Sequence, residues 1–318
     1  MTSIHLPARE LPIPTSISPQ AQAALTMGGL SHPPEWPAHD DHEAWRRLIA
    51  EQDATILAAL AGRVPPKPLS KTTRVIDGVT VYVVEPEGGN DDRVVLNMHG
   101  GALVFMGGDA CAAMTVTAAG QTGMPTWGVD YRMPPDHPYP AALDDCLTVY
   151  CAMLGEYSPD RIVVSGGSAG GNLAAALIVR ARDEGVPLPA AVVLGTPEVD
   201  LTESGDSFNI NDGIDPLLGR LMPVNLLYAG GHDLAHPYLS PLFADLTGFP
   251  PTVLTTGTRD LFLSNTVRMH RALRRAGAEA ELHVLEAAPH GGFLGMAPED
   301  AEVAADVQRF VNRYCPPR

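Results

Sequence analysis

The sequence predicts an α/β fold in which a mostly parallel, eight-stranded sheet is flanked by helices and partly covered by a helical cap. Short apolar runs alternate with helical segments from residue 94 onward, which is the pattern of strands joined by crossover helices. At the centre of this pattern, a Gly-x-Ser-x-Gly turn joins a β-branched run to a helical one. The length of 318 residues suits one core with an accessory cap.

Two helices are expected before the first strand. Ser18-Pro19 has the residue types of a helix N-cap and first helical position, and the apolar run after it predicts a helix to about Met27. Between residues 41 and 60, apolar side chains recur at helical spacing with charged residues between them, which predicts an amphipathic helix. We assign residues 1–65 to N-terminal cap helices and residues 66–318 to the main domain.

The first two strands are expected to form a hairpin, because the turn dipeptide Asp77-Gly78 separates Thr73–Ile76 from Val79–Val84. Six more strands are predicted at Val94–Met98, Trp127–Tyr131, Ile162–Ser165, Ala191–Thr196, Val253–Gly257 and Leu282–Leu285. Helices are predicted between and after them at about 110–121, 138–154, 169–184, 263–276 and 299–313.

One connection breaks this alternation. About 50 residues separate Thr196 from Pro250, and a structureless loop of that length is unusual inside a domain. We therefore interpret residues 197–245 as a helical cap insertion. Together with the N-terminal helices, the insertion is expected to roof the C-terminal edge of the sheet and to line an apolar pocket.

Ser168 is the leading candidate for a nucleophile, because it lies at the turn between a strand and a helix, where its hydroxyl is exposed. Gly166 and Gly170 allow the tight turn, since a side chain at either position would collide with the neighbouring strand or helix. The alternative is a glycine-rich phosphate-binding turn. A dinucleotide site, however, has Gly-x-Gly-x-x-Gly near the start of its domain, and this turn follows four strand candidates.

A serine hydroxyl needs a base and an orienting acid to become a nucleophile. His290 directly follows the last predicted strand and Asp260 follows the strand before it, which are the loops that face ligands in a parallel sheet. Capping of the next helix is the alternative role for Asp260. Other histidines are weaker candidates because they lie in the insertion, on a helix or inside a strand: His232, His236, His270 and His283.

The stretch from Asn97 to Ala102 follows a core strand and supplies a candidate oxyanion hole. Its small residues let backbone N–H groups approach a carbonyl oxygen without hindrance. Two donors from this stretch and the N–H of Ala169, at the positive end of a helix, would make a three-point site.

These residues resemble the hormone-sensitive-lipase-like group of α/β-hydrolases, which are bacterial esterases. The resemblance covers about residues 70–315 in the family's order. Four segments carry it: His99-Gly100-Gly101-Ala102 against the family's His-Gly-Gly-Gly, Asp130-Tyr131-Arg132 with Pro135–Asp144, Gly166–Gly171, and the pair Asp260 and His290.

The resemblance implies a role for each matched residue. Ser168 is the nucleophile, His290 the base and Asp260 its orienting acid. The N–H groups of Gly101, Ala102 and Ala169 are the oxyanion donors, Gly100 completes the oxyanion-hole loop, and His99 shapes it. The segment from Tyr131 to Asp144 is assigned to packing rather than catalysis.

Two positions depart from the family pattern. Ala102 stands where the family has its third glycine, so a positive φ there would strain the hole, and the methyl group would narrow the acyl side. Gly167 stands where many relatives have Asp, which removes a charge beside the nucleophile. Neither change abolishes the expected mechanism.

The expected activity is hydrolysis of carboxylic esters through a serine acyl-enzyme, without a metal or an organic cofactor. The resemblance implies substrates with short to medium acyl chains. A lactone hydrolase would use the same attack and the same oxyanion hole, so it remains an alternative. A non-catalytic small-molecule receptor on the same scaffold is a second alternative, but such receptors are expected to lose a triad member and none is lost here.

Bulk properties limit the partners. A formal net charge of -16 disfavours nucleic acid and anionic membrane surfaces. The four cysteines lack metal-binding or disulfide spacing and are expected to be reduced thiols: Cys111, Cys146, Cys151 and Cys315. With no signal-like N-terminus and no membrane-span candidate, a cytoplasmic location is expected. Relatives of this kind often pair through the last strand and helix, so a homodimer through about 281–313 is expected.

Overall fold

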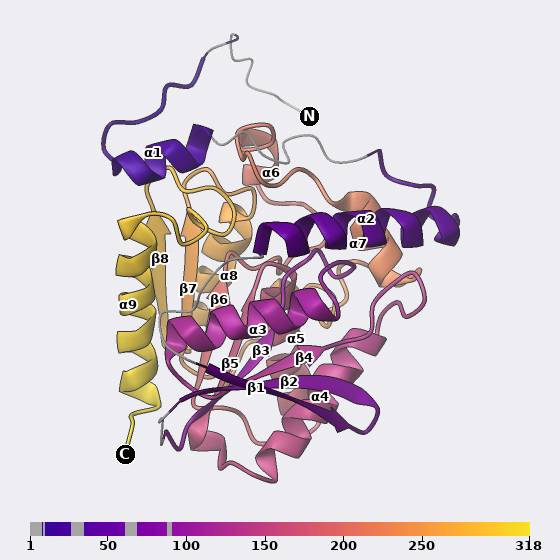
Figure 1. The fold of residues 1–318 in the computed structure, drawn as a ribbon, viewed down its shortest axis with the longest axis vertical. Coiled ribbons are helices and arrows are strands. Elements are labelled where there is room, and N and C mark those ends of the chain that lie inside the picture. The colour runs from indigo at the N-terminus through magenta and orange to yellow at the C-terminus, as the bar shows by residue number, and fades with distance from the viewer. Residues whose placement is uncertain (1–7, 9, 27–34, 61–68, 88–90) are drawn as a thin grey trace.

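The computed structural model describes residues 8, 10–26, 35–60, 69–87 and 91–318, and an eight-stranded sheet forms its centre (Figure 1). The strands are β1 (Leu69–Ile76), β2 (Val79–Pro86), β3 (Val94–Met98), β4 (Thr126–Asp130), β5 (Ile162–Gly167), β6 (Ala191–Gly195), β7 (Thr252–Gly257) and β8 (Ala280–Leu285). Their order across the sheet is β1-β2-β4-β3-β5-β6-β7-β8. β2 runs antiparallel to β1 and β4, and the other neighbours are parallel. The predicted fold class is confirmed.

The hairpin at Asp77-Gly78 has the geometry that the dipeptide predicts. Both residues have positive φ values, 46° and 88°, and Ile76 pairs directly with Val79. The parallel strands that follow the hairpin have nearly continuous apolar runs, because helices cover both faces of the sheet there. All five residues of β3, for example, are buried.

Helices form a layer on each face of the sheet (Figure 1). On one face, α4 (Ala141–Leu154), α5 (Ala169–Asp183) and α8 (Leu263–Arg275) contribute to the largest apolar cluster. On the other, α3 (Asp109–Thr122) and α9 (Pro298–Tyr314) pack on the central strands. A 3-10 turn, η1 (Pro159–Arg161), leads into β5. The helices predicted from the sequence agree with these five within three residues at each end.

The first helix, α1 (Pro19–Thr26), begins where the sequence predicts, and Met27 lies outside the described residues. Ser18 caps it by accepting a hydrogen bond from the Ala21 N–H at 3.1 Å. The N–H and hydroxyl of Ser18 both donate to the carboxylate of Glu299, at 2.7 and 2.8 Å. These bonds attach α1 to the start of α9.

The second helix, α2 (His42–Leu60), has Asp41 as its N-cap, because the Ala44 N–H donates to the Asp41 carboxylate at 3.0 Å. Its one fully buried side chain, Trp45, lies in an apolar cluster with Phe105 from the loop after β3 and with Val224 from the insertion. The second N-terminal helix and the insertion therefore share one apolar core, separate from that of the sheet.

The insertion between β6 and β7 is less helical than expected. It holds two short α-helices, α6 (Ser207–Ile210) and α7 (Met222–Ala229), and the 3-10 turn η2 (Pro241–Phe243). Proline and glycine recur between these pieces, which ends each helix after one or two turns. Side chains hold the intervening chain instead; for example, the Glu203 carboxylate accepts the Leu221 N–H at 2.7 Å. That α2 and this insertion act as a cap stays a prediction.

Among the described helices, none combines the length and the apolar character needed to cross a bilayer. All four cysteines are free thiols, and three of them are buried.

Candidate active site

The turn at Ser168 is held in a strained conformation between β5 and α5. Ser168 has φ 57° and ψ −122°, a region that residues other than glycine rarely adopt. A Cβ atom on Gly166 would lie 2.1 Å from the carbonyl oxygen of Gly170, and one on Gly170 would lie 2.1 Å from that of Met98. The two glycines are therefore required because backbone meets backbone on both sides of the serine.

The structure brings Ser168, His290 and Asp260 together in one hydrogen-bonded chain. The Nε2 atom of His290 lies 2.9 Å from Ser168 Oγ, and its Nδ1 atom lies 3.0 Å from Asp260 Oδ1. Asp260 is fully buried, and its other oxygen accepts a hydrogen bond from the Thr256 hydroxyl at 2.6 Å. Three loops that are far apart in the sequence thus meet at the C-terminal edge of the parallel strands.

Asp260 also has the local role that the sequence offered as its alternative. The Phe262 N–H, at the start of α8, donates to Asp260 Oδ1 at 2.8 Å. The same oxygen therefore orients the imidazole and fixes the turn before the helix. The four rival histidines make no hydrogen bond to Ser168 in the described part of the chain; His283, for example, pairs with Glu281 at 2.9 Å.

The electrostatic surroundings of His290 favour its protonated form. Burial lowers the pKa of His290, but the nearby acids outweigh burial and raise that pKa above its ordinary value. Asp260 contributes most among these acids, through its charge and its hydrogen bond; the charge of Asp215 acts in the same direction, as does that of Glu198 when it is ionised.

Asp215 is a part of the site that the sequence analysis missed. Its Oδ2 atom accepts the backbone N–H groups of His290 at 3.1 Å and Leu261 at 3.0 Å, so one buried carboxylate connects the loops that carry His290 and Asp260. Burial raises the pKa of Asp215. Asp215 lies in an Asp-Pro turn of the insertion and follows no predicted strand. No pattern in the sequence therefore identifies it, since its burial is visible only in the structure.

Glu198 is a second missed residue. It follows β6, and its N–H donates to the carbonyl oxygen of Ser168 at 3.1 Å. Its side chain is fully buried, and neither carboxylate oxygen has a hydrogen-bond partner among the described residues. Burial raises the pKa of Glu198 to about 8, so the group is mostly a neutral acid at pH 7. Its position at the end of a parallel strand was a signal that could have found it.

The loop from His99 to Gly108, here called the oxyanion-hole loop, lies against the serine. A Cβ atom on Gly100 would be 3.5 Å from that of Ser168. The N–H groups of Gly101, Ala102 and Ala169 donate no hydrogen bond in the described part of the chain. They are therefore available to a ligand oxygen.

Ala102 has φ 51°, so the position does require the left-handed conformation that the family's glycine adopts easily. A non-glycine residue there stores on the order of 1 kcal/mol of strain or more. The predicted strain is present, and the surrounding loop has to hold it. The other departure, Gly167, is exposed and carries no charge beside the serine.

His99 anchors the start of the oxyanion-hole loop. Its ring stacks on Tyr131 with the centroids 4.1 Å apart, and the Tyr131 hydroxyl donates to the His99 carbonyl oxygen at 2.8 Å. The next residue, Arg132, forms a bidentate pair with Asp145. These contacts are structural, in line with the packing role assigned to the segment after Tyr131.

The far end of the same loop is attached to the N-terminal helix α2. The Met106 N–H donates to the Asp53 carboxylate at 2.7 Å, and Met106 itself has φ 76°. Burial raises the pKa of Asp53. The sequence analysis did not identify Asp53, because only the tertiary fold brings α2 to this loop.

Comparison with known families agrees with this geometry. A family described by the alpha/beta hydrolase fold matches residues 95–294, which is more than half of the chain. The chain belongs to the α/β-hydrolase family. Within it, this hydrolase is similar to a solved esterase of the bacterial hormone-sensitive lipase family, with 29% identity, a TM-score of 0.83, and coverage of 94% of this chain and 99% of that one. The resemblance to the hormone-sensitive-lipase-like group is thus confirmed.

Other relatives of this hydrolase have similar names. The solved structure of an esterase named E25 is 37% identical, with a TM-score of 0.91, and covers 98% of this chain and 99% of that one. The carboxylesterase NlhH of Mycobacterium tuberculosis is 30% identical over 91% of this chain and 94% of the relative. An esterase of Acinetobacter venetianus is 31% identical over 69% of this chain and 75% of the relative.

The bond between Asp53 and Met106 can be tested with a matched pair of variants. We expect Asp53→Ala to lower kcat by about tenfold with little change in KM, because a loop misplaced by a fraction of an ångström loses transition-state contacts. Asp53→Asn keeps an oxygen that can accept the Met106 N–H and should stay near wild type. Steady-state kinetics on a p-nitrophenyl ester measures both, and an Asp53→Ala enzyme with wild-type kcat would contradict the positioning role.

Proposed function

We propose that this hydrolase cleaves small carboxylic esters through a covalent acyl-enzyme on Ser168. One observation carries the proposal: the hydrogen-bonded chain from Ser168 Oγ through the His290 imidazole to the Asp260 carboxylate. A hydroxyl bonded to an imidazole that is itself oriented by a carboxylate is the arrangement that activates a serine nucleophile.

The first half of the reaction forms the acyl-enzyme. Ser168 Oγ attacks the ester carbonyl carbon while His290 Nε2 takes its proton. Asp260 stabilises the imidazolium, which holds a proton on each ring nitrogen. Collapse of the tetrahedral intermediate breaks the bond to the alkoxy oxygen, and His290 gives the proton to the departing alcohol.

The second half releases the acid. Water loses a proton to His290 and attacks the acyl carbon, and the proton then returns to Ser168 Oγ as the ester bond to the enzyme breaks. In both halves the negative charge on the carbonyl oxygen is met by the N–H groups of Gly101, Ala102 and Ala169, with Gly100 beside the serine in the same loop. Fixed donors of this kind lower the barrier by about 3 kcal/mol each.

A cleft of about 430 Å³ lies between the N-terminal segment and the insertion. Its lining is apolar at Trp36, Leu218, Met222 and Pro223 and charged at Asp212, Asp215 and Arg220. Ser168 and His290 do not line it, but Asp215 does, and the carboxylate of Asp215 holds the backbone of His290. The cleft in the proposed cap therefore lies next to the loop that carries His290. Its volume is in the range that binds small ligands.

Removal of the nucleophile tests the acyl-enzyme. We expect Ser168→Ala to lower kcat by about 10⁴-fold or more and to abolish labelling by an organophosphate, because among the described residues no other hydroxyl is bonded to His290. Ser158→Ala, on an exposed turn, is the control and should label like wild type. Mass spectrometry of the labelled protein decides the question, and a folded wild type that takes no label would favour a receptor without catalysis.

The dependence of activity on pH tests the base. His290 must be neutral to accept the proton, and its raised pKa means that kcat/KM should fall, as the pH is lowered, at a value above the ordinary histidine pKa of about 6.5. Asp260→Asn removes the negative charge that raises the pKa of His290. The midpoint of the kcat/KM profile should therefore move to lower pH, and kcat should fall by about 10⁴-fold. Asp245→Asn, on an exposed turn, should change neither. An unmoved midpoint in Asp260→Asn would disprove the coupling.

Membership of the hormone-sensitive-lipase-like group predicts a preference among substrates. We expect kcat/KM to be highest for p-nitrophenyl acetate to octanoate and to fall sharply for the palmitate, because the resemblance implies short to medium acyl chains. A panel of lactones measured beside the esters separates the two reactions. Faster turnover of lactones than of any ester would replace the ester assignment.

The exposed edge of the sheet supports a homodimer through residues 281–313. β8 pairs only with β7 in the described sheet, and its Val284 side chain is 44% exposed. An unpaired edge with an exposed apolar side chain is a surface that tends to be covered. Light scattering should give about twice the monomer mass of 33.7 kDa, and Val284→Lys should shift the protein toward the monomer. A wild type with the monomer mass would disprove the dimer.

A further inference from the structure

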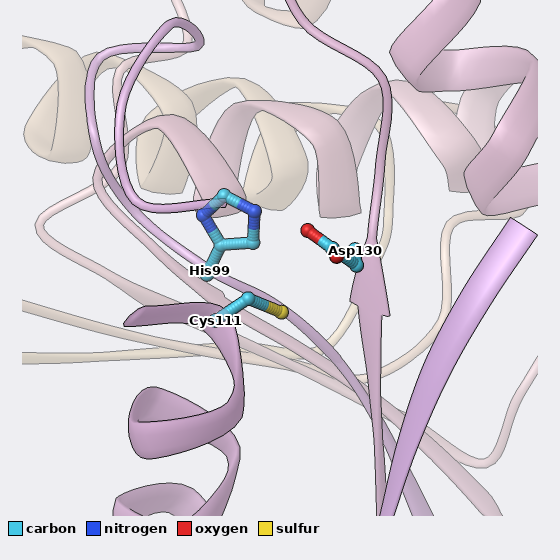
Figure 2. Close-up of side chains that lie close together, drawn as sticks. All are labelled: His99, Cys111 and Asp130. Atoms are coloured by element: carbon cyan, nitrogen blue, oxygen red, sulfur yellow. The ribbon is translucent and has the colours of Figure 1, made fainter. Parts of the chain in front are cut away.

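A second cluster of reactive side chains lies behind the oxyanion-hole loop (Figure 2). It consists of His99 just after β3, Cys111 in the first turn of α3 and Asp130 at the end of β4. One donor atom from each lies within 4.8 Å of the others. His99 and Cys111 are each 1% exposed, while Asp130 is half-buried and borders solvent.

The imidazole of His99 is prepared as a metal ligand. Its Nδ1 atom lies 2.7 Å from the carbonyl oxygen of Gly100, which can only accept, so Nδ1 holds the proton and Nε2 has the free lone pair. Nε2 is buried and has no hydrogen-bond partner among the described residues. An N–H that donates to a backbone carbonyl while the other nitrogen stays free is the usual state of a metal-binding histidine.

The other two donors are also oriented by neighbours. The Gly108 N–H donates to Asp130 Oδ1 at 2.9 Å, and the Tyr82 hydroxyl contacts Oδ2 at 3.5 Å, so the carboxylate keeps capacity for a cation. In the described part of the chain, the Cys111 thiol donates one long hydrogen bond of 3.5 Å, to the carbonyl oxygen of Val129. Figure 2 shows the His99 ring and the Asp130 carboxylate facing each other beside the thiol.

We propose that His99 Nε2, Cys111 Sγ and Asp130 form a binding site for a zinc-like divalent cation, with water as the fourth ligand. One nitrogen, one sulfur and one oxygen are ligand types that Zn²⁺ accepts in tetrahedral geometry, at about 2.0–2.3 Å. On binding, the metal–sulfur bond replaces the S–H bond of Cys111 and the proton leaves to solvent. The donors must move slightly inward, and the half-buried side of Asp130 gives the ion a way in.

The site is coupled to the oxyanion-hole loop because His99 directly precedes Gly100. Drawing His99 toward the ion shifts the start of the loop relative to Ser168, and small displacements of catalytic donors reduce the rate steeply. We therefore expect the bound cation to lower kcat by several-fold, with little change in KM. Sequence analysis did not reveal this site, because positions 99, 111 and 130 match no known metal-binding spacing.

The test uses Co²⁺ and Cd²⁺ as spectroscopic probes on the full chain after treatment with a chelator. We expect one equivalent of metal to bind, with the near-ultraviolet charge-transfer band of a thiolate ligand. Cys111→Ser should lose the band and bind at least tenfold more weakly. Cys151→Ser, which changes the one exposed cysteine, is the matched control and should titrate like wild type.

Two further measurements make the result unambiguous. Asp130→Asn should keep the band and weaken binding by about tenfold, while circular dichroism verifies that each variant is folded.

Zn²⁺ should reduce the kcat of wild type but not of Cys111→Ser. No band in wild type, or a band that persists undiminished in Cys111→Ser, would overturn the site. Zn²⁺ inhibition that is equal in both would overturn the coupling to the loop. Neither result would affect the esterase proposal, which depends on Ser168.

Discussion

The close contact of backbone on both sides of Ser168 is the constraint on which the rest of the site depends. Gly166 packs against Gly170, and Gly170 packs against the end of β3, with no room for a single methyl group at either glycine. This contact forces the serine into its strained conformation and brings the first turn of α5 close to the oxyanion-hole loop. Ser168, the proposed nucleophile, and the N–H groups around it are thus placed by main-chain packing between a strand and a helix, and sites built on such elements are more precise than sites on loops.

Buried acids organise the other half of the site. Asp260 orients the imidazole, Asp215 holds the backbone that carries it, and Glu198 lies buried behind the serine. Three acids around one histidine would repel one another if all were ionised. Burial raises the pKa of Asp215 and Glu198, so both acids are neutralised more readily than an exposed carboxylate and the repulsion is reduced, while Asp260 is the acid bonded directly to the His290 ring.

The parts of the site that depend on local patterns could be predicted from the sequence, and the parts that depend on tertiary contacts could not. Strand ends and the Gly-x-Ser-x-Gly turn pointed to Ser168, Asp260 and His290, because in a parallel sheet the loops after the strands meet at one edge. Asp53, on α2, accepts a hydrogen bond from Met106 in the oxyanion-hole loop. No local sequence pattern connects this helix with that loop. The insertion was expected to be helical, but its prolines and glycines interrupt the helices. Hydrogen bonds from side chains to the backbone hold much of it instead, and such bonds leave no periodic pattern in the sequence.

The attachment of α1 makes the N-terminal segment a support for the loop that carries His290. Ile17 and Ala21 pack on Ala287, Ala288 and Phe293, which flank His290 on both sides, and Ser18 is bonded to Glu299 beyond them. The first helix therefore packs against the loop that carries His290, the proposed base, although α1 lies more than a hundred residues from Ser168, Asp260 and His290 in the sequence. A shortened recombinant form that begins at the sheet would keep these three side chains but lose the contacts of Ile17 and Ala21 with that loop.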